Sequence, residues 1–322
     1  MSAAPDAGDR TLTGMTGEEH HDVVVVGGGA AGVNCALECF DIQLDTVLVE
    51  ASASLGGQLP EILHSVRNVA AGRFADGEAL QRALLESAEI LGDRVRLSHP
   101  VTTADVGARA VEVDGVRLSG RALVVATGTR KQYLEAAPDG AFGGDVTYQL
   151  EPQLLSFAGR DVAVIGGGDS ATLDALELAR RGSSVKLIHR SPDLTARQDI
   201  LRQLHDQPRI EDLSGWELEA AQGTERLESI VLVRPSNGER QEVAVQGLVV
   251  KIARAPNTQL FDGQLELDRS GAVVVDRELR ASRAGIFAVG DVVAGAYPRV
   301  AAALGQGSLA ARSVLHYLEG RS

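Results

Sequence analysis

The sequence predicts an α/β protein organised around two parallel-sheet units, and an internal repeat is the main reason. Residues 22–50 and 161–189 align with one another without a gap. Each copy begins with a run of β-branched apolar residues, which is typical of a strand buried on both faces, and continues into an alanine- and leucine-rich helical stretch. Each copy ends in a second apolar strand. Because parallel strands must be joined by a crossover, each copy is predicted to be a βαβ unit.

A glycine-rich turn lies between the first strand and the helix of each copy, GGGAAG at 27–32 and GGGDSA at 166–171. The first glycine permits a tight turn, the second lets the backbone approach a diphosphate, and the third position must be small for helix and strand to pack closely. Two such turns in register predict two Rossmann-like nucleotide-binding domains. The residues expected at the nucleotides are Gly27, Gly29, Ala30, Ala31, Gly32, Gly166, Gly168, Asp169, Ser170 and Ala171.

The two copies differ where the second strand ends, which is where a ribose is recognised. Glu50 stands there in the first copy, and His189 followed by Arg190 stands in the second. A carboxylate accepts hydrogen bonds from a ribose 2′-hydroxyl, whereas an arginine pairs with a 2′-phosphate. The first site is therefore expected to hold FAD and the second NADPH, with Arg197 as a second phosphate contact. The alternative is that Arg190 and Arg197 are solvated surface charges.

Composition limits the function classes. A chain of 322 residues with 44% apolar residues is long enough for two domains, and a net charge of −13 makes a nucleic-acid partner unexpected. Cys35 and Cys39 are too few for a disulfide framework, and no apolar run is long enough to span a membrane. We therefore expect a cytoplasmic protein without a metal site and with a disordered tail at 1–21.

Further strands are predicted outside the repeat. Asp114-Gly115 and Asn237-Gly238 each lie between two strand-like segments, as in β-hairpins. Buried strands are expected at 122–126, at a segment ending near Ile252, and at 285–291, before a long C-terminal helix.

Seven motifs in this order resemble the low-molecular-weight thioredoxin reductases and the thioredoxin-reductase-like ferredoxin-NADP reductases. They are GGGAAG at 27–32, LGGQL at 55–59, ATG at 126–128, GGGDSA at 166–171, HR at 189–190, PNT at 256–258 and GIFAVGD at 285–291. The resemblance covers about residues 22–318. It implies a homodimer that binds FAD and NADPH, with two three-layer Rossmann-like domains.

The resemblance also implies domain boundaries and further FAD contacts. The NADPH domain, 131–253, would be inserted into a discontinuous FAD domain, 22–130 and 254–322. Asp291 would bind the ribityl chain, although a helix N-cap is the alternative for that side chain. The other residues expected at FAD by resemblance are Gly56, Gly57, Gln58, Ala126, Thr127, Gly128, Gly290 and Val300.

The sequence departs from thioredoxin reductase at the redox-active Cys-x-x-Cys. The corresponding residues 149–152 are QLEP, which cannot form a thiolate, so reduction of thioredoxin through an internal dithiol is not expected. Cys35 and Cys39 lie at i and i+4 of a predicted helix and are interpreted as structural. His64 and Arg67, in a loop after LGGQL, are assigned either to the flavin site or, as the simpler alternative, to a solvated loop.

These features predict an FAD-dependent oxidoreductase that passes hydride from NADPH to FAD and then to an external acceptor. A ferredoxin- or flavodoxin-type electron carrier is favoured because residues 149–152 resemble the ferredoxin-reductase branch. One alternative is a flavin-dependent reductase or oxidase acting on a small disulfide, dithiol or quinone. A second is a non-catalytic flavin-binding protein with a vestigial NADPH site. No catalytic side chain is assigned, because the cofactors carry the chemistry.

Overall fold

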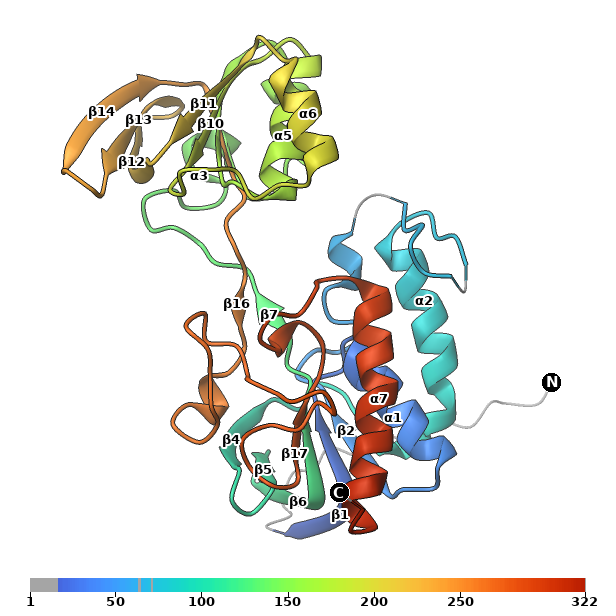
Figure 1. Cartoon of the computed structure of the whole chain (residues 1–322). Coiled ribbons are helices and arrows are strands. Elements are labelled where there is room, and N and C mark those ends of the chain that lie inside the picture. Colours follow the sequence, from blue (N-terminus) through green and yellow to red (C-terminus); the bar gives the residue numbers. More distant parts are fainter. Residues whose placement is uncertain (1–16, 63–64, 71, 322) are drawn as a thin grey trace. The chain divides into compact units, whose positions relative to one another are not determined.

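The chain forms two compact units in the computed structural model, which describes residues 17–62, 65–70 and 72–321. Unit 1 combines the described residues up to 130 with those from 255, and unit 2 comprises residues 131–254 (Figure 1). Residues 1–16 of the predicted tail, and His64, lie outside the described residues. The tail prediction is wrong for residues 18–21, because the first strand already begins at Glu18.

The sheet of unit 1 has the strand order β3-β2-β1-β6-β5-β4, and β17 also pairs with β6. β1 pairs in parallel with β2 and β6, whereas β4, β5 and β6 form antiparallel pairs. The hairpin predicted at Asp114-Gly115 joins β5 to β6, and both residues have the positive φ of a type I′ turn. The strands are β1 Glu18–Val26, β2 Thr46–Val49, β3 Val95–Arg96, β4 Val101–Asp105, β5 Ala110–Val113, β6 Val116–Val125 and β17 Ile286–Ala288, and a separate ribbon pairs β7 Thr129–Arg130 with β16 Ala255–Pro256.

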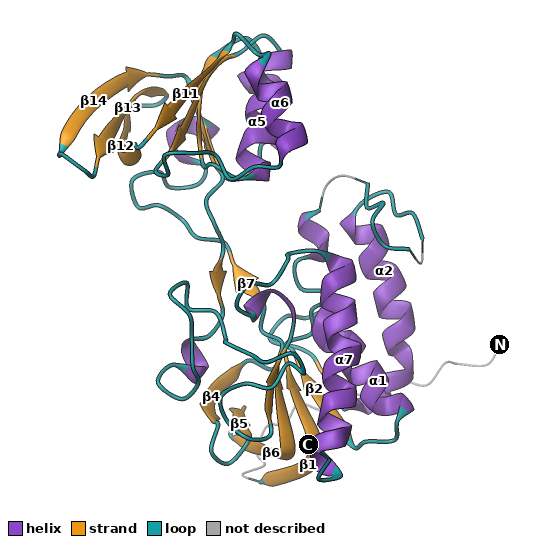
Figure 2. Cartoon of the chain, in the orientation of Figure 1, coloured by secondary structure: helices purple, strands orange, loops and turns teal. Residues whose placement is uncertain are grey.

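Helices cover one face of this sheet (Figure 2). Val23 and Val25 of β1 point to that face and pack with buried residues of α1 and α7. Val24 and Val26 point to the other face and pack with buried residues of β5 and β6 and of the segment that includes Phe261. Unit 1 therefore has three layers. Its helices are α1 Ala30–Asp41, α2 Gly77–Ala88 and α7 Val300–Leu318, with short 3₁₀ turns η1 Leu59–Glu61, η2 Glu89–Arg94, η4 Gln259–Phe261 and η5 Gly290–Val292.

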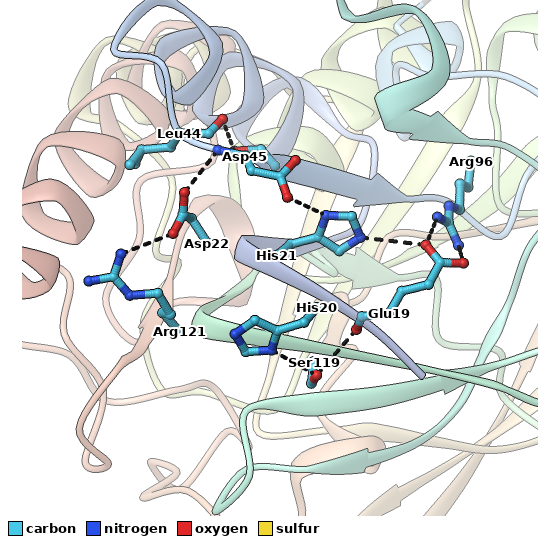
Figure 3. A network of polar contacts seen from close by, with 10 residues as sticks. Glu19, His20, His21, Asp22, Leu44, Asp45, Arg96, Ser119 and Arg121 are labelled. Atoms are coloured by element: carbon cyan, nitrogen blue, oxygen red, sulfur yellow. Dashed lines mark hydrogen bonds and ion pairs between the residues drawn. The ribbon is translucent and has the colours of Figure 1, made fainter. Parts of the chain in front are cut away.

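A polar network extends β1 toward its N-terminus (Figure 3). His21 lies between two carboxylates, with Nδ1 3.0 Å from Asp45 Oδ2 and Nε2 3.6 Å from Glu19 Oε2. Arg96 pairs with Glu19, and this hydrogen bond lowers the pKa of the Glu19 carboxyl. The backbone of Glu18–His21 pairs with β6. These contacts explain why a segment with the polar sequence EEHH adopts strand structure.

The main sheet of unit 2 has the order β11-β10-β9-β15-β8 and is parallel. A second, antiparallel sheet contains β12-β13-β14, and its β13–β14 connection is the hairpin predicted at Asn237-Gly238. The strands are β8 Val146–Thr147, β9 Asp161–Ile165, β10 Ser184–His189, β11 Ile210–Ser214, β12 Glu217–Gly223, β13 Leu227–Arg234, β14 Glu239–Ala244 and β15 Gly247–Val250, and the helices are α3 Ala141–Gly144, η3 Glu151–Gln153, α4 Leu154–Phe157, α5 Asp169–Arg180 and α6 Gln198–His205.

Unit 2 also has three layers. Val162 and Val164 of β9 pack with buried residues of α4 and α5, whereas Ala163 and Ile165 pack on the opposite face with residues of the antiparallel sheet. Each βαβ copy thus lies at the centre of its own unit. None of the helices within the described ranges is both long and apolar enough to cross a membrane.

Candidate functional site

The first glycine turn joins β1 to α1 in unit 1, and its glycines meet three different constraints. Gly27 has φ +110°, and a Cβ there would collide with the carbonyl of Ala126. A Cβ at Gly32 would collide with the carbonyl of Gly27, so this position must be glycine for α1 to approach β1. Gly29, in contrast, would point a Cβ into open space. The space beside Gly29 fits a cofactor that approaches the backbone closely.

Glu50 follows β2 and contacts the same turn. Its Oε2 accepts a hydrogen bond of 2.6 Å from the backbone amide of Gly28, and its Oε1 accepts one of 2.8 Å from Ser52. These two charge-assisted hydrogen bonds from backbone amides hold the Glu50 carboxylate in one orientation. The predicted ribose acceptor therefore lies beside the glycine turn.

A second loop lies against this turn. Gly56 forms a parallel bridge with Gly29, and its amide donates to the carbonyl of Gly28 at 2.8 Å. Gln58 extends from this loop, where its Nε2 donates to Thr129 Oγ1 at 3.1 Å and lies 3.5 Å from Asp291 Oδ2. The structure thus brings together residues that are far apart in the sequence.

Further predicted residues meet at the carboxyl ends of β6 and β17. Thr127 Oγ1 donates to the carbonyl of Asn257, and Asn257 Nδ2 donates back to the carbonyl of Thr127, at 2.7 and 2.8 Å. Gly290 approaches α1 so closely that an added Cβ would lie 3.0 Å from Ala31 Cβ. The Gly290 amide donates to Gln306 Oε1 at 2.6 Å. Asp291 is in the first turn of η5 and not an N-cap.

Sequence reasoning missed Asn257 and Gln306. Asn257 belongs to the PNT motif, which could have drawn attention to it, but Gln306 lies inside α7 and has no local signal. Val300, in contrast, is the first residue of α7 and packs with a cluster that includes Val66 and Val69. Its predicted role at FAD is not tested by these contacts.

The second glycine turn joins β9 to α5 in unit 2 and repeats the same constraints. Gly166 has φ +139°, and a Cβ there would collide with the carbonyl of Lys251 and lie 3.0 Å from Ala171 Cβ. Alanine therefore fits the third small position. At Gly168 the nearest atom to an added Cβ would be Thr195 Oγ1, at 3.9 Å. The backbone at Gly168, directly before the start of α5, is therefore open to a diphosphate.

The predicted phosphate contacts differ in their surroundings. Arg190 is exposed, and none of the ion pairs found in the described ranges involves it. His189 is buried, with Nε2 2.7 Å from Asp212 Oδ1, and its Nδ1 has no hydrogen-bond partner among the described atoms. Gly167 lies against this ring, since an added Cβ would be 3.6 Å from Nδ1. An unpaired buried nitrogen beside the turn fits a polar ligand there.

Arg197 and Asp169 bind each other. Arg197 Nε lies 2.9 Å from Asp169 Oδ2, and the Arg197 amide donates to Asp169 Oδ1 at 2.9 Å. The loop before α6 is also held to the turn by Thr195, whose amide donates to the carbonyl of Gly167. Asp169 therefore positions the loop that carries Arg190 and Arg197.

The two cysteines lie in α1 and are both fully buried and unpaired. The pKa of the Cys35 thiol is raised well above its ordinary value. The hydrogen bond with Cys39 is the largest cause, and burial is the second. Such a thiol is not a reactive thiolate.

The structure also locates residues 149–152, which replace the Cys-x-x-Cys. Leu150 is packed in the core of unit 2, and Glu151 starts η3. Arg67 is exposed and donates to Ser65.

Comparisons with known proteins agree with this arrangement of two nucleotide turns. The model of the family described as pyridine nucleotide-disulphide oxidoreductase matches residues 21–307. The chain is 30% identical to a thioredoxin reductase of Streptomyces coelicolor, over 90% of this chain and 91% of that one. It is 28% identical to an NADH dehydrogenase of Bacillus subtilis over 94% of this chain, and it spans only 59% of that protein.

A solved structure gives the same picture. The thioredoxin reductase of Lactococcus lactis superposes with a TM-score of 0.76 at 27% identity, and the match covers 93% of this chain and 99% of that one. The T. acidophilum thioredoxin reductase, at 23% identity and a TM-score of 0.74, shares the fold. The predicted fold class is confirmed by these matches.

Proposed function

Because the chain belongs to the pyridine nucleotide-disulphide oxidoreductase family, we propose that it transfers reducing equivalents from NADPH, through FAD, to an acceptor outside the chain. FAD and NADPH are the cofactors of this oxidoreductase. Bound flavin supplies the capacity to take up hydride and to release electrons in pairs or singly. The contribution of this chain is to bind and orient the two cofactors.

We assign FAD to unit 1 and NADPH to unit 2. The turn at 27–32, Glu50 and the Gln58–Asp291 contact support the first assignment, because the carboxylate of Glu50 would accept ribose hydroxyls and repel a 2′-phosphate. Arg190 supports the second, because it is exposed, has no ion pair among the described residues, and directly follows His189, whose ring lies against Gly167 of the second turn. A guanidinium binds phosphate with two parallel hydrogen bonds, which favours NADPH over NADH.

The observation that supports an acceptor outside the chain is that both cysteines are buried. Cys35 and Cys39 are the two cysteines of the sequence, and both are buried in α1, while residues 149–152 contain no cysteine. A dithiol relay inside the chain needs two accessible thiols within bonding distance. The acceptor is therefore reduced directly by the flavin.

We favour an electron-carrier protein of the ferredoxin or flavodoxin class as the acceptor, in a homodimeric cytoplasmic enzyme. Residues 149–152 and the cysteine usage support this choice. A small disulfide, dithiol or quinone is the second candidate. A binding protein without turnover is a third, and the open turn at Gly168 argues against it, because a site without function has no reason to keep this space free.

Anaerobic addition of NADPH to the purified yellow protein tests the proposal. We expect the long-wavelength flavin absorption to bleach, and to return when ferredoxin or flavodoxin is added. An unchanged spectrum with NADPH would remove the oxidoreductase proposal. Bleaching that is reversed by a quinone or a low-molecular-weight disulfide, and not by either carrier protein, would replace the favoured acceptor with the second candidate.

A further inference from the structure

A buried ion pair lies next to the glycine turn of unit 2. Asp174 is in the second turn of α5, and Lys251 directly follows β15. Lys251 Nζ is 3.2 Å from Asp174 Oδ2, and the two side chains are 17% and 15% exposed. The surface pair Lys186–Glu211 of the same unit is 30% and 58% exposed. Moving two charges out of water costs free energy, so the location of this pair needs an explanation that an exposed ion pair does not.

Lys251 also touches the turn through its main chain. Its amide donates to the carbonyl of Ile165 at 2.7 Å, and its own carbonyl occupies the space that a Cβ on Gly166 would need. One residue therefore contacts both sides of the nucleotide-binding turn: the strand end and Gly166 through its backbone, and the helix α5 through its side chain.

The location of the pair in the sheet is significant. In the order β11-β10-β9-β15-β8, the chain crosses to the other side of β9 when it forms β15. Dinucleotides bind across the crevice at such a switch point, beyond the carboxyl ends of the strands. Arg190 follows the neighbouring strand on one side of β9, and Lys251 follows the strand on the other side.

Among the described residues, Lys251 and Glu151 are the charged groups that affect the pKa of the Asp174 carboxyl. Burial raises this pKa from 3.8 to about 6, the charge of Lys251 opposes this rise, and the charge of Glu151 in η3 adds to it. The Asp174 carboxyl is therefore ionised at neutral pH, and the ion pair is lost when Asp174 takes up a proton in mild acid.

We propose that Asp174 and Lys251 form a positioning pair for NADPH, which holds the start of α5 and the end of β15 at the spacing that the diphosphate and nicotinamide ribose require. The inference rests on the assignment of NADPH to unit 2. Breaking the pair lets α5 shift relative to β15, so that the amides at the start of α5 no longer converge on the ligand.

Titration calorimetry of the full FAD-loaded chain with NADP⁺ tests the pair, with Lys251→Met as the variant. We expect its dissociation constant for NADP⁺ to rise about tenfold, equivalent to about 1.4 kcal/mol. Lys186→Met breaks the exposed pair with Glu211 and is the matched control, for which the dissociation constant stays within about twofold.

The pH dependence gives a second, independent readout. The wild-type affinity for NADP⁺ should fall as the pH decreases through the Asp174 pKa, and Asp174→Asn should show the weaker affinity on both sides of it. The 2′-phosphate of NADP⁺ itself titrates near pH ~6. Since this ligand effect is present in both proteins, the difference between their pH profiles isolates Asp174.

The outcomes separate the inference from the proposed function. If Lys251→Met unfolds more easily but binds NADP⁺ as the wild type does, the pair is structural and the inference fails. If the wild type binds NADP⁺ and its pH profile matches that of Asp174→Asn, the inference also fails while the NADPH assignment stands. If the wild type binds no NADP⁺, the NADPH assignment itself is wrong.

Discussion

Glu50 Oε2 accepts a hydrogen bond from the backbone amide of Gly28 at 2.6 Å, which ties the end of β2 to the centre of the first glycine turn. The carboxylate does this while its other oxygen binds the amide of Ser52. The side chain that is expected to recognise the ribose of FAD is therefore also part of the scaffold that shapes the diphosphate site. Removing it affects both.

Glu50→Ala should weaken FAD binding by about tenfold or more, because two backbone amides lose a charged acceptor and the ribose loses its partner. Glu50→Gln keeps one acceptor oxygen and should lie between the wild type and the alanine variant. The measurement is the dissociation constant of FAD from its fluorescence on release. Glu86→Ala, on the exposed face of α2, is the control and should retain the flavin. Equal retention by Glu50→Ala would show that Glu50 is not a FAD contact.

Gly29→Ala and Gly32→Ala should fail in different ways. A methyl group on Gly32 collides with the carbonyl of Gly27, so this variant is expected to lose about 2 kcal/mol of stability even without FAD. A methyl group on Gly29 meets no atom of the described residues within 4 Å and should leave the apoprotein's unfolding unchanged. It occupies the space assigned to the cofactor, however, so FAD affinity should fall. Urea unfolding of both apoproteins and flavin titration make the comparison, and a Gly29→Ala variant that binds FAD normally would contradict the assigned position of the diphosphate.

Local patterns in the sequence predict the central parts of both units. The βαβ copies, their glycine turns and the Asp114-Gly115 hairpin depend on residues within one short stretch, where periodicity and turn chemistry are decisive. The N-terminus of β1 could not be predicted this way. Glu18–His21 are polar, and they adopt strand structure through pairing with β6 and ion pairs with Arg96 and Asp45.

Contacts between distant segments account for the residues of the candidate sites that the sequence did not reveal. Gln306, inside α7, accepts a hydrogen bond from the Gly290 amide. Lys251, at the end of β15, forms an ion pair with Asp174 of α5. Such side chains carry no motif, because their role depends on the sheet order and on helix packing. The contact of Glu50 with the first turn was predictable, because the βαβ unit alone sets the position of the strand end relative to the turn, whereas the role of Arg190 stays a prediction.

Arg190→Ala should change coenzyme preference. Loss of a guanidinium that pairs with the 2′-phosphate is expected to weaken NADPH binding by about 10- to 100-fold and to leave NADH binding nearly unchanged. The Arg197→Ala effect should be smaller, because Arg197 is already engaged by Asp169. Binding of adenosine 2′,5′-bisphosphate and of adenosine 5′-monophosphate by calorimetry gives the comparison without turnover. Equal use of NADH and NADPH by the wild type would refute the role of Arg190.

The raised pKa of Asp174 predicts how the stability of unit 2 depends on pH. The folded state binds a proton at about 6 and the unfolded state near 3.8, so the folded state takes up more protons in between. The contribution of Asp174 to the free energy of unfolding is therefore fully present below pH 3.8 and is lost as the pH rises to about 6. A shift of about two pKa units corresponds to about 3 kcal/mol.

Asp174→Asn lacks this titration, so its free energy of unfolding should decline less than that of the wild type over the same pH interval. Trp216 is the single tryptophan of the sequence and is buried in unit 2, which makes its fluorescence in urea a direct report on this unit. Asp206→Asn, at the exposed end of α6, controls for the loss of one carboxylate and should follow the wild type. Parallel curves for the wild type and Asp174→Asn would show that Asp174 titrates alike in the folded and unfolded chain, and burial beside Lys251 would then have no energetic consequence.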